Sequence, residues 1–155
     1  MTLITTDDIG GFHLDLEGLE VTAVVVDGVP VTFRRTEGEL VVELGTTAAA
    51  GEELVVDVEY AGRPAPLVGV VPFTAVGWEQ TSWGVRAASQ PRGTSTWMPV
   101  SDHPSDPATW SIELIVDDPL VAVASGRLAD RRGVGEGRTS YRWVVDEPMS
   151  PHALL

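Results

Sequence analysis

The chain has 155 residues, of which 23 are acidic and 10 basic, so its formal net charge at pH 7 is −13. A field of that sign repels nucleic acid and anionic membranes, and we expect neither as a partner. The chain has no cysteine, which excludes disulfides and thiolate chemistry, and no apolar run approaches the ~18 residues of a membrane helix. No basic and apolar leader is visible, so we expect a cytoplasmic protein of one domain.

The first half of the chain predicts short strands joined by tight turns. Residues 12–16 alternate apolar and polar side chains, as a half-buried strand does. Residues 21–26 are rich in Val, and the Asp27-Gly28 pair that follows indicates a hairpin, because glycine adopts positive φ without steric cost. The prolines within 61–72 predict a long connection. Further strands of the same kind are predicted at 31–33, 40–44 and 54–60.

The second half continues the same pattern. Residues 78–88 have the composition of one or two strands, and residues 110–116 alternate before an Asp-Asp-Pro stop. We also predict that 120–124 and 126–131 pair with each other, and that 139–145 forms the closing strand. Some eight to ten short, mostly antiparallel strands are typical of an all-β sandwich or a saddle-like open barrel.

One segment, WMPVSDHPSDPATW at 97–110, fits neither a strand nor a helix. Its three prolines each fix φ near −65° and stiffen the chain. Asp102 and Asp106 have short carboxylates that can accept hydrogen bonds from nearby backbone N–H groups. Trp97 and Trp110 are large enough to anchor both ends in a core. Two interpretations stay open: a corner that crosses between sheets, or a rigid edge presented to another domain.

The chain carries no complete catalytic constellation. It has no His-Glu-x-x-His, no Gly-x-Ser-x-Gly and no glycine-rich phosphate loop. His103 and Asp106 are spaced so that they could touch, but zinc requires at least three protein ligands. His13 alternates with Phe12 and is expected on the solvent face of a strand, and His152 is far from both other histidines in the sequence. We therefore expect no catalytic residue and no metal in this chain.

Several stretches resemble, in the same order, the N-terminal domain of M1-family zinc aminopeptidases, which are similar to aminopeptidase N. The first is Phe12–Val21 with the later Val26-Asp27-Gly28, and the second is Ser89-Gln90-Pro91 followed by Trp97–Ala108. The turn at Ser125–Leu128 and the Asp146–Met149 turn are also similar to that family. Together these stretches span nearly the whole chain.

This resemblance implies an all-β N-terminal domain, in which the proline-rich loop is a structural corner. The corner residues would be Trp97, Pro99, Asp102 and Pro104. In that family, the segment before the corner reaches the active site of the neighbouring catalytic domain, where a Gln helps to hold the peptide substrate. Gln90 matches that Gln. Two places later the family often has a Glu that binds the free amino terminus, and this chain has Arg92, which would repel an ammonium group.

The family's zinc motif and its Gly-x-Met-Glu-Asn motif lie downstream of this domain, and neither is in this chain. The resemblance thus implies that residues 1–155 are most of an N-terminal domain, cut at both ends and inactive alone. The zinc would belong to the catalytic domain, and the partners would be that domain and the N-terminus of a peptide. If the domain is cut at both ends, the strands at Leu3–Thr6 and Thr139–Val145 would each have an unpaired edge, and we expect two copies of the chain to associate through such edges.

Two other interpretations remain open. The chain could be a stand-alone β-sandwich module that binds a carbohydrate or a protein, because Trp faces stack on ligands. It could also be a structural sandwich domain of an unrelated protein. A His-Glu-x-x-His further along the same gene would separate the first interpretation from these. The candidate stacking residues are Trp78, Trp83, Trp97 and Trp110.

Overall fold

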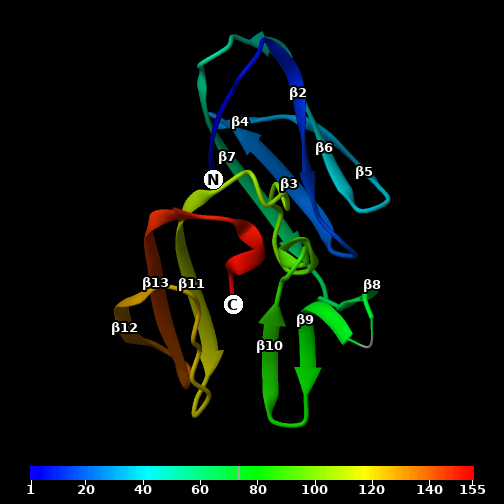
Figure 1. The fold of residues 1–155 in the computed structure, drawn as a ribbon. Helices are drawn as coiled ribbons and strands as arrows, with labels where there is room; N and C mark the ends of the chain where they lie inside the picture. Colours follow the sequence, from blue (N-terminus) through cyan, green and yellow to red (C-terminus); the bar gives the residue numbers. More distant parts are fainter. Residues whose placement is uncertain (73) are drawn as a thin grey trace.

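A computed structural model describes residues 1–72 and 74–155 and confirms the all-β prediction. The described part contains thirteen strands in four antiparallel sheets and two single-turn 3-10 helices. The strand number exceeds the eight to ten predicted, because pieces of two or three residues also pair and because Leu67–Val71 adds a strand that was not predicted. Figure 1 shows a sandwich built by the first part of the chain above two further sheets, with both 3-10 helices near the junction.

Two sheets pack face to face to form the N-terminal sandwich. One has the order β2-β6-β5 and the other β1-β7-β3-β4. Their strands are β1 (Thr2–Ile4), β2 (Ile9–Asp15), β3 (Glu20–Val26), β4 (Val29–Pro30), β5 (Thr32–Thr36), β6 (Glu39–Ala48) and β7 (Glu53–Ala61). The alternating apolar residues of both sheets form one buried cluster, which includes Leu14, Leu16, Leu40, Val42, Val24, Leu54 and Val56. This burial is what alternation along the strands predicts.

The Asp27-Gly28 hairpin forms as predicted. Asp27 has φ 50° and Gly28 has φ 78°, as expected for a two-residue turn with both central residues at positive φ. Val26 pairs with Val29 across the turn. The Asp27 carboxylate accepts a hydrogen bond from the backbone N–H of Val55 at 2.9 Å, which fastens the turn to the neighbouring strand β7.

The second region is a small sheet with the order β10-β9-β8. It consists of β8 (Leu67–Val71), β9 (Thr74–Thr81) and β10 (Gly84–Ala88). The residues 78–88, for which one or two strands were predicted, lie in the hairpin that β9 and β10 form. The prediction of an irregular connection over 61–72 is wrong for Leu67–Val71. The prolines of the segment 61–72 lie at 64, 66 and 72, outside the strand, and the mostly apolar residues between Pro66 and Pro72 pair with β9.

The third region has the order β11-β13-β12. Its strands are β11 (Ala108–Asp117), β12 (Arg127–Gly135) and β13 (Arg138–Met149). The predicted pair of 120–124 with 126–131 is wrong: β12 pairs with β13 through a tight Gly-rich turn, and 120–124 joins no strand ladder. The expected bare edge at Thr139–Val145 is also wrong, because β13 is the central strand, paired on both sides. Strand β1 does lie at a sheet edge.

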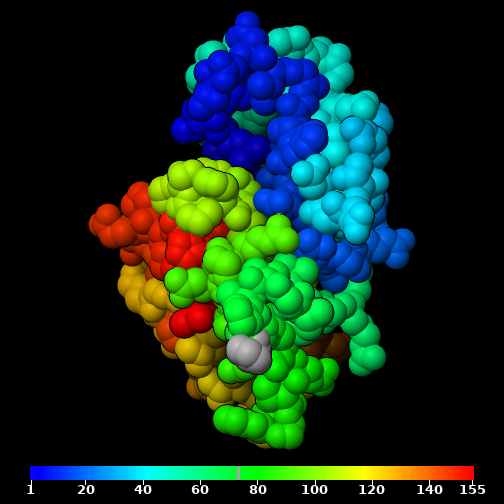
Figure 2. Space-filling model, turned by 45° about the vertical axis from the view of Figure 1, so that its right-hand side comes forward, coloured from blue at the N-terminus to red at the C-terminus, as the bar shows by residue number. Residues whose placement is uncertain are grey.

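The three regions meet at the 3-10 helices η1 (Thr94–Thr96) and η2 (Pro151–Ala153). In Figure 2 the segment that follows η1, in yellow-green, lies against both the blue sandwich and the red C-terminal residues. Within the described ranges no helix is long and apolar enough to cross a membrane.

Candidate functional site

The segment that holds Gln90 runs from the end of β10 to η1. Gln90 is exposed, whereas Ser89 before it and Gly93 after it are buried, with Ser89 only 1% exposed. The Gln90–Pro91 peptide bond is cis. Within residues 1–72 and 74–155 no hydrogen bond engages the Gln90 side chain, so its amide is available to a ligand, while the chain on either side is held by the protein.

Asp102 fixes the base of this segment. Its Oδ2 atom accepts hydrogen bonds from the backbone N–H of Gly93 at 2.9 Å, from the backbone N–H of Ser95 at 3.1 Å and from Ser95 Oγ at 2.9 Å. Its own backbone N–H donates to Asp15 Oδ2 at 2.8 Å. Hydrogen bonds to a carboxylate are stronger than those between neutral groups. The Asp102 side chain therefore holds the start of the Gly93–Asp102 loop firmly against its end.

Thr96 attaches the same loop to the hairpin of β9 and β10. Its Oγ1 accepts the backbone N–H of Trp78 at 2.9 Å and donates to the carbonyl of Gly93 at 2.7 Å. Gly77 and Gly93 lie so close that a Cβ on Gly93 would come within 2.7 Å of the Gly77 nitrogen. Both positions are therefore restricted to glycine by contact, and Gly77 also has φ +89°.

The loop also contacts the other two regions. Val100 forms a two-way backbone bridge with Asp15, and the carbonyl of Ser95 accepts the N–H of Glu17 at 2.8 Å. On the opposite side, buried Thr94 donates from Oγ1 to the carbonyl of Pro151 at 2.7 Å. The Gly93–Asp102 loop thus holds the N-terminal sandwich, the β9–β10 hairpin and the C-terminal residues in one arrangement.

Three of the four tryptophans considered as ligand platforms are engaged inside the protein. Trp97 and Trp78 are half-buried, and their ring centroids lie 6.4 Å apart at an interplanar angle of 41°. The carbonyl of Trp97 accepts the Tyr60 hydroxyl at 3.1 Å, and partial burial raises the pKa of Tyr60, which keeps 38% of its surface exposed. Trp110 donates from Nε1 to the carbonyl of Met149 at 2.9 Å. Only Trp83 differs among these four, with 89% of its surface exposed.

Two prolines of the segment 97–110 occupy different environments. Pro99 is buried, whereas Pro104 is exposed and its carbonyl accepts the Ser150 hydroxyl at 2.6 Å. The side chains of His103 and Asp106, whose spacing would allow them to touch, form no hydrogen bond with each other within the described residues, and His103 Nδ1 lies 2.7 Å from Ser105 Oγ. Asp106 contributes its backbone N–H to the carbonyl of His103.

No metal site can be assembled from the residues that the structure describes. They contain no group of three or more His, Cys, Asp or Glu side chains arranged to hold an ion. His13 lies on the solvent face as expected, and its Nδ1 is 3.1 Å from a carboxylate oxygen of Glu39. Two exposed groups do not make a zinc site.

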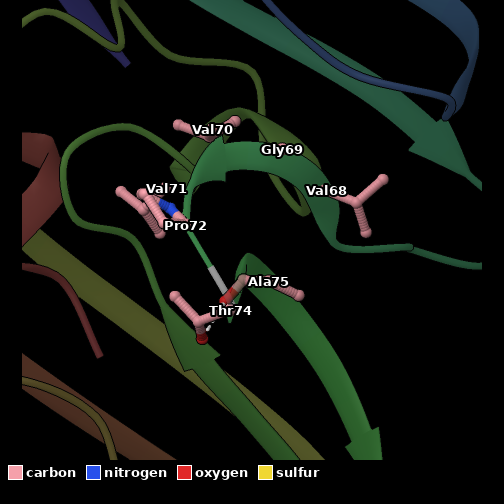
Figure 3. Close-up of a pocket in the computed structure, with 7 residues that line it drawn as sticks. All are labelled: Val68, Gly69, Val70, Val71, Pro72, Thr74 and Ala75. Atoms are coloured by element: carbon pink, nitrogen blue, oxygen red, sulfur yellow. Dashed lines mark hydrogen bonds between the residues drawn. The ribbon is translucent and has the colours of Figure 1, made fainter.

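A shallow hollow at the turn between β8 and β9 adds no chemistry. Figure 3 shows that Val68, Val70, Val71 and Ala75 line it together with a backbone glycine, a proline and one threonine. None of these lining residues is ionisable.

The candidate site is therefore the exposed Gln90 segment, whose base is held by Asp102 and Thr96. The sequence pointed to Gln90 and Asp102 as candidates, but it did not predict that Ser95, Thr96, Gly77 and Gly93 support them. Serine, threonine and glycine occur in many loops, so residue type alone does not indicate these contacts.

Comparison with known proteins gives this fold a family. The sequence profile of the Peptidase M1 N-terminal domain matches residues 9–152. No curated protein sequence matches the chain. Among solved structures, an M1 zinc metallopeptidase from Deinococcus radiodurans is similar, with a TM-score of 0.92 and 28% identity over 99% of this chain. A mutant of that metallopeptidase bound to a Tyr-Ser-Ala substrate gives the same TM-score, identity and coverage.

A more distant structure shows how far the fold extends. Aminopeptidase A from Legionella pneumophila, in complex with aspartic acid, has a TM-score of 0.79 at 16% identity, over 94% of this chain and 17% of its own. At that identity the likeness is one of fold alone. The present chain spans 35% of the Deinococcus radiodurans protein, so these solved structures are much longer than the chain.

Proposed function

This chain belongs to the Peptidase M1 N-terminal domain family, and we propose on that basis that it is the non-catalytic N-terminal domain of a zinc aminopeptidase. Its role would be to form one wall of the site where a catalytic domain removes N-terminal residues from peptides. The match over residues 9–152, together with a fold that covers 35% of a zinc metallopeptidase, is the observation that carries this proposal. Residues 1–155 would then be part of a longer parent chain.

The Gln90 segment supports the role of a substrate wall. Its side-chain amide is exposed, and the backbone on both sides of it is fixed by buried contacts of Ser89 and by the hydrogen bond from Gly93 to Asp102. A donor and acceptor held on a rigid base binds a peptide backbone with little loss of conformational entropy. Arg92 is also exposed, and we assign it no part in binding a substrate ammonium group, because both would be cations.

The residues of this chain do not fit a zinc ion, since the described part offers no set of three ligands. We therefore propose that the zinc and the groups that act on the scissile bond belong to the catalytic domain of the parent. That domain is also the partner that we propose for this chain, with the N-terminus of a peptide as the ligand at the wall. A cytoplasmic location stays a prediction from the sequence.

The parent protein tests this proposal. The gene that continues beyond these residues should encode a His-Glu-x-x-His, and the parent should hydrolyse an aminoacyl anilide, whereas residues 1–155 alone should not. In the parent, Gln90→Ala should raise KM severalfold. Gln80→Ala removes an exposed glutamine from β9 and serves as the matched control. A parent without the motif or the activity would contradict the proposal, and equal KM values for both variants would remove Gln90 from the substrate wall.

A further inference from the structure

The candidate site exposes three consecutive residues, 90–92, between two buried ones. In Figure 1 this segment leads from the end of β10 to the junction below the N-terminal sandwich. Ser89 on one side of it is 1% exposed, and on the other side the N–H of Gly93 donates to Asp102 Oδ2 at 2.9 Å. The exposed segment is therefore short, and the protein holds both of its ends.

The last exposed residue of the segment, Arg92, carries a free positive charge. Within residues 1–72 and 74–155 no carboxylate lies within 4.0 Å of its guanidinium and no hydrogen bond engages it. A guanidinium keeps its charge throughout the physiological pH range. Other exposed arginines of the chain are each paired with an acidic side chain, namely Arg86, Arg127, Arg132 and Arg138.

The carboxylate of Asp102 is joined to this segment by hydrogen bonds, but it does not neutralise Arg92. Its Oδ2 atom accepts hydrogen bonds from the buried residues Gly93 and Ser95. Its Oδ1 atom is itself buried, and no group among the described residues donates to it. The Asp102 carboxylate is thus turned toward the buried side of the loop, whereas Arg92 lies on the exposed side.

A free guanidinium binds carboxylates well, because its planar N–H groups match the two oxygens of a carboxylate. We propose that Arg92 selects peptides that carry a carboxylate near their N-terminus, and that it is a specificity-determining residue of the substrate wall. The inference rests on the proposed function, which makes Gln90 part of that wall. A basic side chain at the same place in the peptide would be repelled.

The spacing of the two exposed side chains limits where the substrate carboxylate lies. The Cα atoms of Gln90 and Arg92 are at most about 7 Å apart, because each residue of an extended chain spans no more than about 3.6 Å. An extended peptide has the same spacing, so Arg92 would bind a group close to the residue that Gln90 holds. Two carboxylates meet this condition: the side chain of an acidic residue near the N-terminus, and the main-chain carboxylate of a dipeptide.

Steady-state kinetics of the parent protein test the first source. Glutamyl anilide and glutaminyl anilide differ only by a carboxylate against a neutral amide of nearly the same shape. Arg92→Ala should lower the ratio of their kcat/KM values by about tenfold, as expected for a hydrogen-bonded charge pair. Arg92→Lys keeps the charge without the planar fork and should retain part of the preference.

Two further measurements belong to the same experiment. Arg34→Ala removes an exposed arginine of β5 for which no ion pair occurs among the described residues, and this control should leave the ratio unchanged. Added salt should reduce the preference of the wild-type parent for glutamyl anilide, since salt screens exposed charges.

Alanyl-alanine and its C-terminal amide test the second source. If Arg92→Ala lowers kcat/KM for the dipeptide but not for its amide, the bound group is the main-chain carboxylate. A lower ratio in the anilide pair assigns it to the acidic side chain. An equal loss for the acidic and the neutral member of both pairs would mean that Arg92 only supports the segment, and would overturn the inference.

The outcomes also separate this inference from the proposed function. Unchanged ratios in a parent that hydrolyses aminoacyl anilides would overturn the role of Arg92 alone. A parent that hydrolyses none of them would contradict the proposed function, and calorimetry with the same four compounds would then decide the inference. Tighter binding of the acidic compound that is lost in Arg92→Ala would support a carboxylate site, and equal affinities would overturn it.

Discussion

Ser95 donates two hydrogen bonds to a single oxygen of Asp102, one from its backbone N–H at 3.1 Å and one from its hydroxyl at 2.9 Å. The same oxygen also accepts the N–H of Gly93 at 2.9 Å. These donors belong to the short stretch between Gln90 and Trp97, so the position of the candidate substrate residue depends on a carboxylate that lies several residues further along the chain. Removal of that carboxylate would leave the donors of Gly93 and Ser95 without their acceptor.

We predict that Asp102→Ala lowers the free energy of unfolding by about 3 kcal/mol, since each buried donor left without an acceptor costs roughly 1–3 kcal/mol. Chemical denaturation of residues 1–155 measures this change. Asp106→Ala is the matched control, because Asp106 is an exposed aspartate of the proline-rich segment 97–110 whose carboxylate accepts no hydrogen bond within the described residues. It should change the free energy by less than about 0.5 kcal/mol. Equal effects of both variants would contradict the clamp.

We predict that Gly77→Ala destabilises the protein by about 3 kcal/mol, because the new Cβ would lie 2.7 Å from Thr96 Cγ2 and 2.8 Å from the carbonyl oxygen of Gly93, at a φ of +89°. The midpoint of thermal unfolding reports the loss. At Gly133 the same substitution meets no atom within 4 Å, and it should leave the midpoint nearly unchanged. An unaffected Gly77→Ala protein would show that the hairpin does not contact the loop as described.

The fold was more predictable than the connections between its parts. Alternation and the Asp27-Gly28 turn predict most strands and one turn of the N-terminal sandwich, whereas the pairing of β2 with β6 and of β3 with β7 joins distant residues that no local pattern indicates. Leu120–Ala124 has the alternation of a strand, yet it joins no ladder, because ladder formation depends on a partner that a local pattern does not reveal. Leu67–Val71 pairs despite its neighbouring prolines because those prolines lie outside the strand itself.

The candidate site was predictable in part for a similar reason. Gln90 and Asp102 were identified through resemblance and loop chemistry. The contacts of Thr96 with Trp78 and of Thr94 with Pro151 join residues far apart in the chain, and no spacing in the sequence predicts them. Threonine in a loop has many roles, so its residue type alone carries little information.

We predict that Trp97→Ala costs about 3 kcal/mol in the free energy of unfolding, since it removes a large half-buried ring that lies 6.4 Å from Trp78. Trp83→Ala, at an 89% exposed residue, should cost less than about 0.5 kcal/mol. Denaturant titration distinguishes the two variants. A Trp97→Ala protein as stable as wild type would mean that its ring does not anchor the loop, and would reopen its role as a ligand platform.

We predict that the protein loses stability as the pH rises above about 10, the ordinary pKa of tyrosine. Burial raises the pKa of Tyr60 in the folded state, so above pH 10 the unfolded chain loses this proton while the folded chain retains it. The folded state then binds more protons than the unfolded state, and linkage requires that stability falls with rising pH until the folded pKa is passed.

Tyr60→Phe removes this titration and should flatten the decline above pH 10. At pH 7 the variant should lose about 1 kcal/mol, because the hydrogen bond from the Tyr60 hydroxyl to the carbonyl of Trp97 is gone. The chain has no lysine and no cysteine, so few other side chains change charge in this range. Denaturant unfolding at intervals between pH 8 and pH 11 provides the comparison. If the decline is as steep in Tyr60→Phe as in wild type, it arises elsewhere, and the partial burial of Tyr60 does not control stability at alkaline pH.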